Sequence, residues 1–102
     1  MGTAIQEMGN VDRILHSPAR LMVVTILYTA DSADFLYLQR ETGLRKGNLS
    51  SNLSKLEESN YLEIEKTYRG KIPLTVCRLT AKGRVAFQEY RVRLQQFLRS
   101  TG

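Results

Sequence analysis

The residues best suited to chemistry lie in the segment 42–57, where leucines recur at helical spacing among short polar and basic side chains. A helix beginning near Lys46 would place Leu49, Leu53 and Leu56 on one buried stripe. Its opposite arc would carry Ser and Asn, which are mediocre helix formers, in place of the Glu and Lys pairs of an ordinary surface helix. Short hydrogen-bonding groups suit close approach to base edges and phosphates, so the segment is predicted to read DNA. A solvated helix face that merely packs is the alternative.

The segment after this helix is predicted to form a β-hairpin with a basic tip. Leu62 and Ile64 alternate with acidic residues, the chain breaks at 69–73, and a second extended run rich in β-branched and apolar residues covers 74–80. A basic tip beside a polar helix would grip two neighbouring stretches of one duplex. The residues expected to contact DNA are Arg45, Lys46, Asn48, Ser50, Ser51, Ser54 and Lys55 on the helix, and Arg69 and Lys71 on the hairpin.

The predicted order of helix, helix, hairpin and helix is that of an α+β winged helix-turn-helix domain. Its characteristic residues keep their order and spacing: Asp34-Phe35, Thr42-Gly43-Leu44, Gly47-Asn48-Leu49-Ser50, Leu53, Leu56-Glu57, Tyr61-Leu62, Pro73, Arg78-Leu79-Thr80, Gly83-Arg84 and Ala86-Phe87. Over residues 12–98 the chain resembles small winged-helix transcriptional regulators, relatives of the MarR and ArsR groups of archaea and bacteria. The resemblance implies a dimeric regulator with the helix after Gly43 in the major groove and the hairpin, or wing, on the backbone or minor groove.

Two positions depart from the family pattern. Arg45 and Lys46 follow Gly43-Leu44 where the family usually has a capping Thr, and Arg cannot accept a hydrogen bond from the first-turn amides. Those amides and two cations would suit a DNA phosphate. Leu74 follows the wing proline where the family often has Arg, which predicts fewer wing contacts.

The last helix, predicted over 81–99, is expected to make a homodimer. At 1.5 Å per residue it would run about 30 Å, which is long for a domain whose three-helix core is already complete. Its apolar face must be buried, and closed two-fold dimers are the commonest solution. The expected interface residues are Ile5, Met8, Tyr90, Leu94, Phe97 and Leu98, while Phe87 is expected to pack on its own core. A helix folded back on its own subunit is the alternative.

The charge distribution also favours a polyanionic partner. The 102-residue chain, the length of one domain, has a formal charge of +5. Residues 66–102 hold nine Lys or Arg and one acid, Glu89, whereas residues 1–65 hold six basic and nine acidic groups. This asymmetry suits double-stranded DNA. An anionic membrane is disfavoured because the basic residues are spread over a hairpin and a helix and do not gather on one polar face.

Other classes of function have little support in the sequence. One His and one Cys cannot make a four-ligand zinc site, no Gly-rich phosphate loop is present, and no catalytic pair is indicated, so neither an enzyme nor a cofactor is expected. Cys77 is expected to be buried, with redox sensing left open. Without a signal-like or membrane-spanning segment, the protein is expected in the cytoplasm. The main rival to a DNA-binding regulator is a winged helix that binds another protein.

The remaining elements are predicted from their start and stop signals. Ser17-Pro18 is expected to begin the first core helix, with Leu21, Val24, Leu27 and Tyr28 facing inward. A polar loop over 31–34 should precede a short helix from Phe35 that ends at Gly43. Thr80 is expected to cap the last helix, and helical spacing predicts a short amino-terminal helix within residues 4–15.

Overall fold

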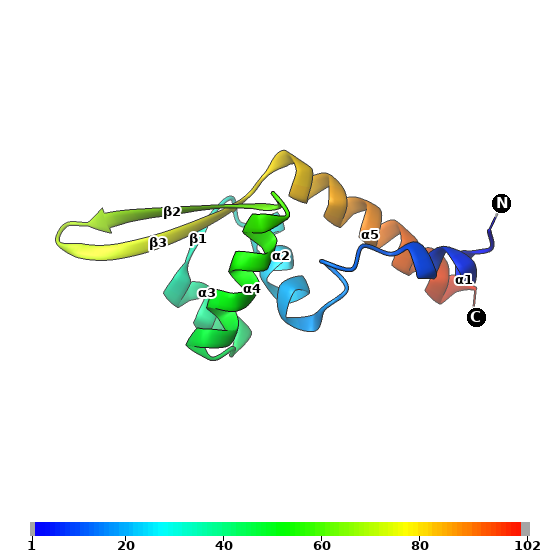
Figure 1. The fold of residues 1–102 in the computed structure, drawn as a ribbon, viewed down its shortest axis with the longest axis horizontal. Helices are drawn as coiled ribbons and strands as arrows, with labels where there is room; N and C mark the ends of the chain where they lie inside the picture. The colour runs from blue at the N-terminus through cyan, green and yellow to red at the C-terminus, as the bar shows by residue number, and fades with distance from the viewer. Residues whose placement is uncertain (1, 101–102) are drawn as a thin grey trace.

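The computed structural model describes residues 2–100 and has the winged-helix order (Figure 1). Helices α2, α3 and α4 form the central body, the β2–β3 hairpin projects from one side of it, and α5 leads away on the other. The elements are α1 (Ala4–Glu7), the 3₁₀ turn η1 (Met8–Asn10), α2 (Pro18–Thr29), β1 (Ala33–Asp34), α3 (Phe35–Thr42), α4 (Lys46–Glu58), β2 (Leu62–Arg69), β3 (Ile72–Leu79) and α5 (Ala81–Arg99). The α+β winged helix-turn-helix prediction is therefore confirmed.

Side-chain caps set the helix starts where the sequence predicted them. Ser17 accepts a hydrogen bond from the Arg20 amide ahead of Pro18, and Thr80 Oγ1 accepts one from the Gly83 amide at 2.9 Å. Helix α3 ends at Gly43, whose φ of 71° is the left-handed conformation that glycine adopts at low cost. These local signals fix where α2 and α5 begin and where α3 ends, just before α4.

The sheet contains one strand where the sequence predicted a loop. Its order is β1-β3-β2 with antiparallel pairing, and Ala33 of β1 lies opposite Cys77 of β3. The prediction of a simple polar loop over 31–34 is wrong at its last two residues. A two-residue strand has no periodicity of its own, and Ala33 pairs because α3 brings it against β3.

The wing turn is also tighter than predicted. Pairing continues to Arg69 opposite Ile72, which leaves Gly70 and Lys71 as a two-residue loop in place of a break over 69–73. Gly70 has a φ of 64°, and a positive φ at the first loop residue fits the right-handed twist of a tight hairpin.

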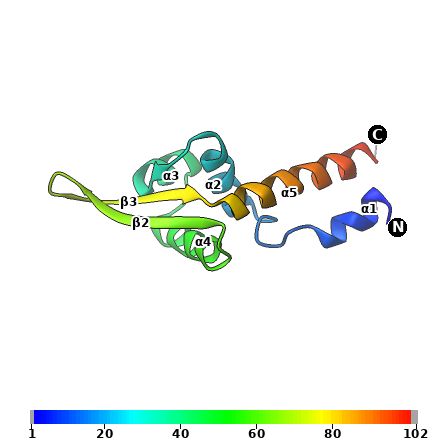
Figure 2. The same cartoon turned by 90° about the horizontal axis from the view of Figure 1, so that it is seen from above.

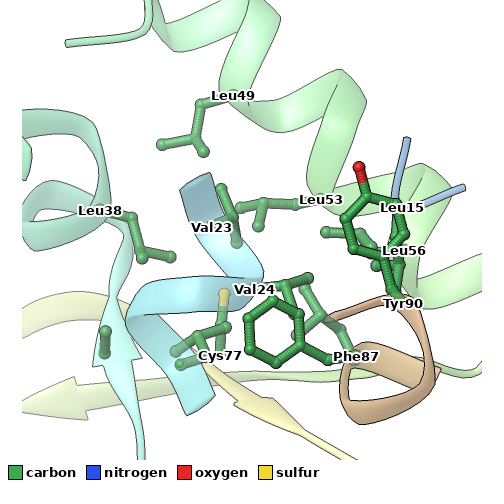
Figure 3. Close-up of a cluster of buried hydrophobic side chains, with 13 residues drawn as sticks. Leu15, Val23, Val24, Leu38, Leu49, Leu53, Leu56, Cys77, Phe87 and Tyr90 are labelled. Carbon is green, nitrogen blue, oxygen red and sulfur yellow. The ribbon is translucent and has the colours of Figure 1, made fainter. Parts of the chain in front are cut away.

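The core lies where the body meets the hairpin and the first turns of α5 (Figure 3). The predicted stripe of Leu49, Leu53 and Leu56 is buried, as are Val24 and Leu27, while Leu21 and Tyr28 are half-buried at its edge. Phe87 is 6% exposed and packs on its own subunit as predicted. The core also contains Leu15, Val23, Ala33, Leu38, Leu62 and Tyr90.

The β2–β3 hairpin and α5 extend the molecule in opposite directions, and the amino-terminal segment lies beside the distal half of α5 (Figure 2). The amino-terminal helix is shorter than the predicted range because Asp12 accepts hydrogen bonds from the Ile14 and Leu15 amides, which forms a turn instead of further helix. Arg93 Nη1 donates to the Asn10 carbonyl at 2.7 Å and ties this segment to α5. None of the helices within residues 2–100 is long and apolar enough to cross a membrane.

Candidate nucleic-acid interface

Helix α4 presents a polar and basic arc opposite its buried stripe. Seven predicted DNA-contacting residues are all exposed on α4 or at its start: Arg45, Lys46, Asn48, Ser50, Ser51, Ser54 and Lys55. Their positions follow from the 3.6-residue period, because the core takes Leu49, Leu53 and Leu56. The arc is therefore held from behind by a fully packed surface.

The amino end of α4 has no side-chain cap, as the sequence predicted. Arg45 occupies the N-cap position with φ −69° and ψ 153°, and its side chain makes no capping hydrogen bond in the described part of the chain. The first-turn amides thus receive no side-chain cap, and two exposed cations, Arg45 and Lys46, lie at the same end of the helix. Such an end attracts an anion because its amides and the helix dipole carry partial positive charge.

A buried hydrogen-bonded relay behind α4 was not predicted from the sequence. Asn52, 7% exposed, lies within the leucine stripe. Arg20 Nη1 of α2 donates to Asn52 Oδ1 at 2.8 Å, and Asn52 Nδ2 donates to the Asn48 carbonyl at 2.9 Å and to Asn48 Oδ1 at 2.6 Å. Arg20 is held in turn because its Nε donates to the Ile14 carbonyl at 2.6 Å. An Asn at an otherwise apolar stripe position was the signal that could have revealed this relay.

The wing directs different residues to its two faces. Directly paired residues of an antiparallel hairpin share a face, and successive residues alternate between faces. Ile64 pairs with the buried Cys77, so the pairs Lys66–Thr75 and Tyr68–Pro73 continue the face that meets the body. Arg69 and Ile72 form a pair on the other face.

A groove of about 730 Å³ separates the wing from α4 and α3. Lys46 and Ser50 line it from the helix, and Lys66 and Thr75 line it from the wing. Lys66 and Tyr68, which is 71% exposed, are thus candidate contacts that were not predicted from the sequence. The pairing register of the hairpin would have revealed both residues, but the sequence alone did not specify that register.

The cations of the candidate interface are not neutralised by the ion pairs of the described residues. Within residues 2–100 the ion pairs are Arg78–Glu65 at 3.0 Å and Arg40–Glu41 at 3.8 Å. The predicted cations Arg45, Lys46, Lys55, Arg69 and Lys71 all lie outside these two pairs and are exposed. Positive charge that is not neutralised within the subunit can attract a polyanion.

Cys77 lies at the base of the wing and has no exposed surface, so the prediction of burial is confirmed. Burial, with a smaller contribution from the negative charges of Glu57 and Asp34, raises the pKa of its thiol to about 11. The thiol therefore stays protonated at neutral pH, where it is a poor nucleophile and metal ligand. Among the residues that the structure describes, His, Cys, Asp and Glu form no group of three or more that could hold a metal ion.

Five of the six residues assigned to a dimer interface lie at the end of the molecule that holds α1 and the distal part of α5, whereas Tyr90 lies midway along α5 and belongs to the core. Ile5 is 59% and Leu98 57% exposed, and Met8, Leu94 and Phe97 are half-buried. Tyr90 is only 5% exposed, and its hydroxyl lies 3.0 Å from His16 Nδ1. Its position within the subunit leaves Tyr90 little surface to offer a partner, because the loop before α2 covers its ring.

The sequence matches a family model described as a winged helix DNA-binding domain over residues 19–98. This match spans both the helical body and the wing, and the chain belongs to that family. The resemblance stated from the sequence motifs is confirmed.

The chain is also similar to an archaeal protein in sequence and to solved structures in fold. An uncharacterized protein of Methanocaldococcus jannaschii is 37% identical over 79 residues, which cover 76% of this chain and 85% of that protein. A transcriptional regulator homologue from Pyrococcus horikoshii OT3 superposes with a TM-score of 0.88 at 24% identity, covering 94% of this chain and 97% of that one. A MarR-family transcriptional regulator from Silicibacter pomeroyi has a TM-score of 0.67 at 18% identity, covering 96% and 63%. The Pyrococcus and Silicibacter proteins therefore share the fold of this chain.

Proposed function

We propose that this protein is a homodimeric transcriptional regulator that binds double-stranded DNA sequence-specifically. Helix α4 enters the major groove, and the wing holds the backbone or the adjacent minor groove. The observation that carries the proposal is the exposed arc of α4, whose small polar and basic side chains continue into unneutralised cations on the wing. Base edges are read by hydrogen bonds in the major groove, and phosphates are held by Lys and Arg.

A protein-binding role for the same arc has less support. Interface hot spots are built from aromatic, aliphatic or Arg anchors in desolvated pockets. The exposed residues within 45–55 include no aromatic or large aliphatic side chain. Because small polar groups and basic residues suit DNA better than a protein surface, DNA is the proposed partner.

The salt dependence of binding tests this proposal. Each phosphate neutralised by Lys or Arg contributes a slope of roughly −0.9 to log K against log salt. For a dimer with several such contacts, we expect a slope larger than about 4 in magnitude on genomic fragments selected for binding. Fluorescence anisotropy over a series of salt concentrations measures this slope. A slope near zero would contradict DNA binding.

The dimer is proposed to form through the distal part of α5 together with α1. This end projects from the body, and the exposed Ile5 and the half-buried Phe97 lie there. Two α4 helices related by a two-fold axis would read half-sites about 34 Å apart, which corresponds to a pseudo-palindromic operator.

Light scattering on two charge-matched variants tests the dimer. We expect Phe97→Glu to yield monomers at tens of micromolar, because a carboxylate would be buried in the interface at a cost of several kcal/mol. Gln95→Glu adds the same charge at an exposed position of α5 and should remain dimeric. A monomeric wild-type protein would contradict both the dimer and the palindrome.

A further inference from the structure

The relay behind α4 determines which hydrogen-bonding group Asn48 can show to a ligand. Asn52 is the one buried polar residue among those described, and it connects Arg20 of α2 to Asn48 on the exposed arc. Amide side chains carry an acceptor and a donor at opposite corners, so the orientation of each amide matters.

The orientation of Asn52 follows from its two neighbours. The Arg20 guanidinium can only donate, so the corner of Asn52 that lies 2.8 Å from it must be Oδ1. The Asn48 carbonyl can only accept, so the corner of Asn52 that lies 2.9 Å from it must be Nδ2. Two independent contacts therefore require the same orientation.

The orientation of Asn48 then follows from that of Asn52. One hydrogen of Asn52 Nδ2 goes to the Asn48 carbonyl, and the other goes to Asn48 Oδ1 at 2.6 Å. Asn48 Oδ1 therefore faces the buried Asn52, and Nδ2 lies at the opposite corner of the amide. No residue within 2–100 accepts a hydrogen bond from Asn48 Nδ2, and the side chain is exposed. Asn48 therefore offers two free N–H donors to solvent.

We propose that Asn48 selects a hydrogen-bond acceptor on DNA, specifically the O6 and N7 edge of guanine, and that Arg20 and Asn52 are the positioning residues that impose this choice. The inference rests on the proposed function. An unconstrained Asn commonly pairs with adenine, donating to N7 and accepting from N6. Here the relay turns the oxygen of Asn48 toward Asn52 and leaves the N–H donors outward, and guanine presents two acceptors that need only donors.

Replacing Asn52 with Asp tests the positioning role. Asp has nearly the same shape and can still accept from Arg20, but it cannot donate to Asn48. The Asn48 amide would then turn, donate Nδ2 to the new carboxylate and present Oδ1 outward. An outward acceptor suits the amino groups of adenine N6 or cytosine N4. The expected result is a change in base preference and not merely a loss of affinity.

The experiment selects binding sites from a randomised duplex library with the full-length wild type, Asn48→Ala and Asn52→Asp. In the wild type, we expect guanine at the base pair whose preference disappears in Asn48→Ala. There, Asn52→Asp should favour adenine or cytosine by about tenfold over guanine, within the range of base-edge contacts. Gln95→Glu is the charge-matched control. Its added negative charge should weaken binding to all duplexes alike, so the preference of the wild type for one base over another should be unchanged.

A second variant keeps the test decisive if Asn52→Asp does not fold, as judged by its thermal unfolding. Asn52→Leu extends the apolar stripe and releases Asn48, so the guanine preference should give way to adenine, the usual partner of an unconstrained Asn. The proposal is overturned if the folded Asn52 variants keep the guanine preference. It is also overturned if Asn48→Ala weakens all duplexes alike, which would assign Asn48 to a phosphate, or leaves the site unchanged. A wild type that selects no sequence would instead contradict the proposed function itself.

Discussion

Helix α4 and the wing both present exposed cations, but the two elements are supported very differently. The leucine stripe of α4 is at most 3% exposed, and the buried Asn52 fixes Asn48 from behind. At the wing tip, Tyr68 is 71% and Ile72 66% exposed, and the two strands there are held chiefly by pairing with each other.

This difference fits the two tasks of a DNA-binding protein. Reading a base edge requires donors and acceptors held to within a fraction of an ångström, which a packed helix can provide. Holding a phosphate requires mainly a positive charge nearby, since Coulomb attraction depends weakly on angle. Under the proposed function, the molecule would combine a reading helix that is packed against the core with a wing that is held mainly by its own strand pairing.

The largest expected effect concerns stability. Leu56→Ala should lower the free energy of unfolding by about 2–5 kcal/mol, because it leaves a cavity behind a fully buried side chain of α4. Ile72→Ala, its counterpart at the wing tip, should change it by less than about 0.5 kcal/mol. Denaturant unfolding monitored by circular dichroism measures both values. Equal losses would show that the wing is integrated into the cooperative core.

The next largest effect should be on discrimination between DNA sequences, which variants of α4 and variants of the wing should change differently. Ser51→Ala on α4 should reduce the preference for a selected site over random duplex by roughly 1–3 kcal/mol if Ser51 makes a good base contact. Arg69→Ala on the wing should weaken both duplexes alike, because phosphates carry no sequence information. Titrations of each variant against both duplexes decide the matter, and a uniform loss from Ser51→Ala would remove it from the reading surface.

A smaller effect is expected in the salt dependence of wing variants. Arg69→Ala and Lys71→Ala should each flatten the slope of log K against log salt by about 0.9 for every phosphate that the variant no longer neutralises. Arg78→Ala, in the same hairpin, should leave the slope unchanged because Arg78 is paired with Glu65 at 3.0 Å. An unchanged slope in both tip variants would place DNA on the Lys66 face of the wing instead.

The smallest response should come from the base of the wing. Because burial raises the pKa of the Cys77 thiol to about 11, a disulfide reagent at pH 8 should label the native protein far more slowly than the unfolded chain. Ile72→Cys provides an exposed reference thiol at the tip and should react rapidly. Rapid labelling of Cys77 in the native protein at pH 8 would show that the base of the wing opens readily.

The same pKa shift predicts a pH dependence of stability. The unfolded chain releases the thiol proton first, near the ordinary pKa of 9.0, so stability should fall as pH rises from about 9 toward 11.

Much of the molecule was predictable because its signals are local. The caps at Ser17 and Thr80, the glycine after α3 and the leucine period of α4 each involve residues within one or two turns of chain. The missing cap at Arg45 was also correctly predicted, since capping depends on the chemistry of a single side chain. Such features were enough to predict the fold class and the exposed arc of α4.

Only the tertiary structure decided which distant residues meet. The relay joins Arg20 to Asn52 across 32 positions, and Tyr90 is buried because His16, 74 positions away, lies against it. Pairing of Ala33 with β3, and the face of the wing that carries Lys66, likewise depend on packing and register. The period of a sequence specifies which face of an element is apolar, but not which partner covers it, because that choice is made by the whole core at once.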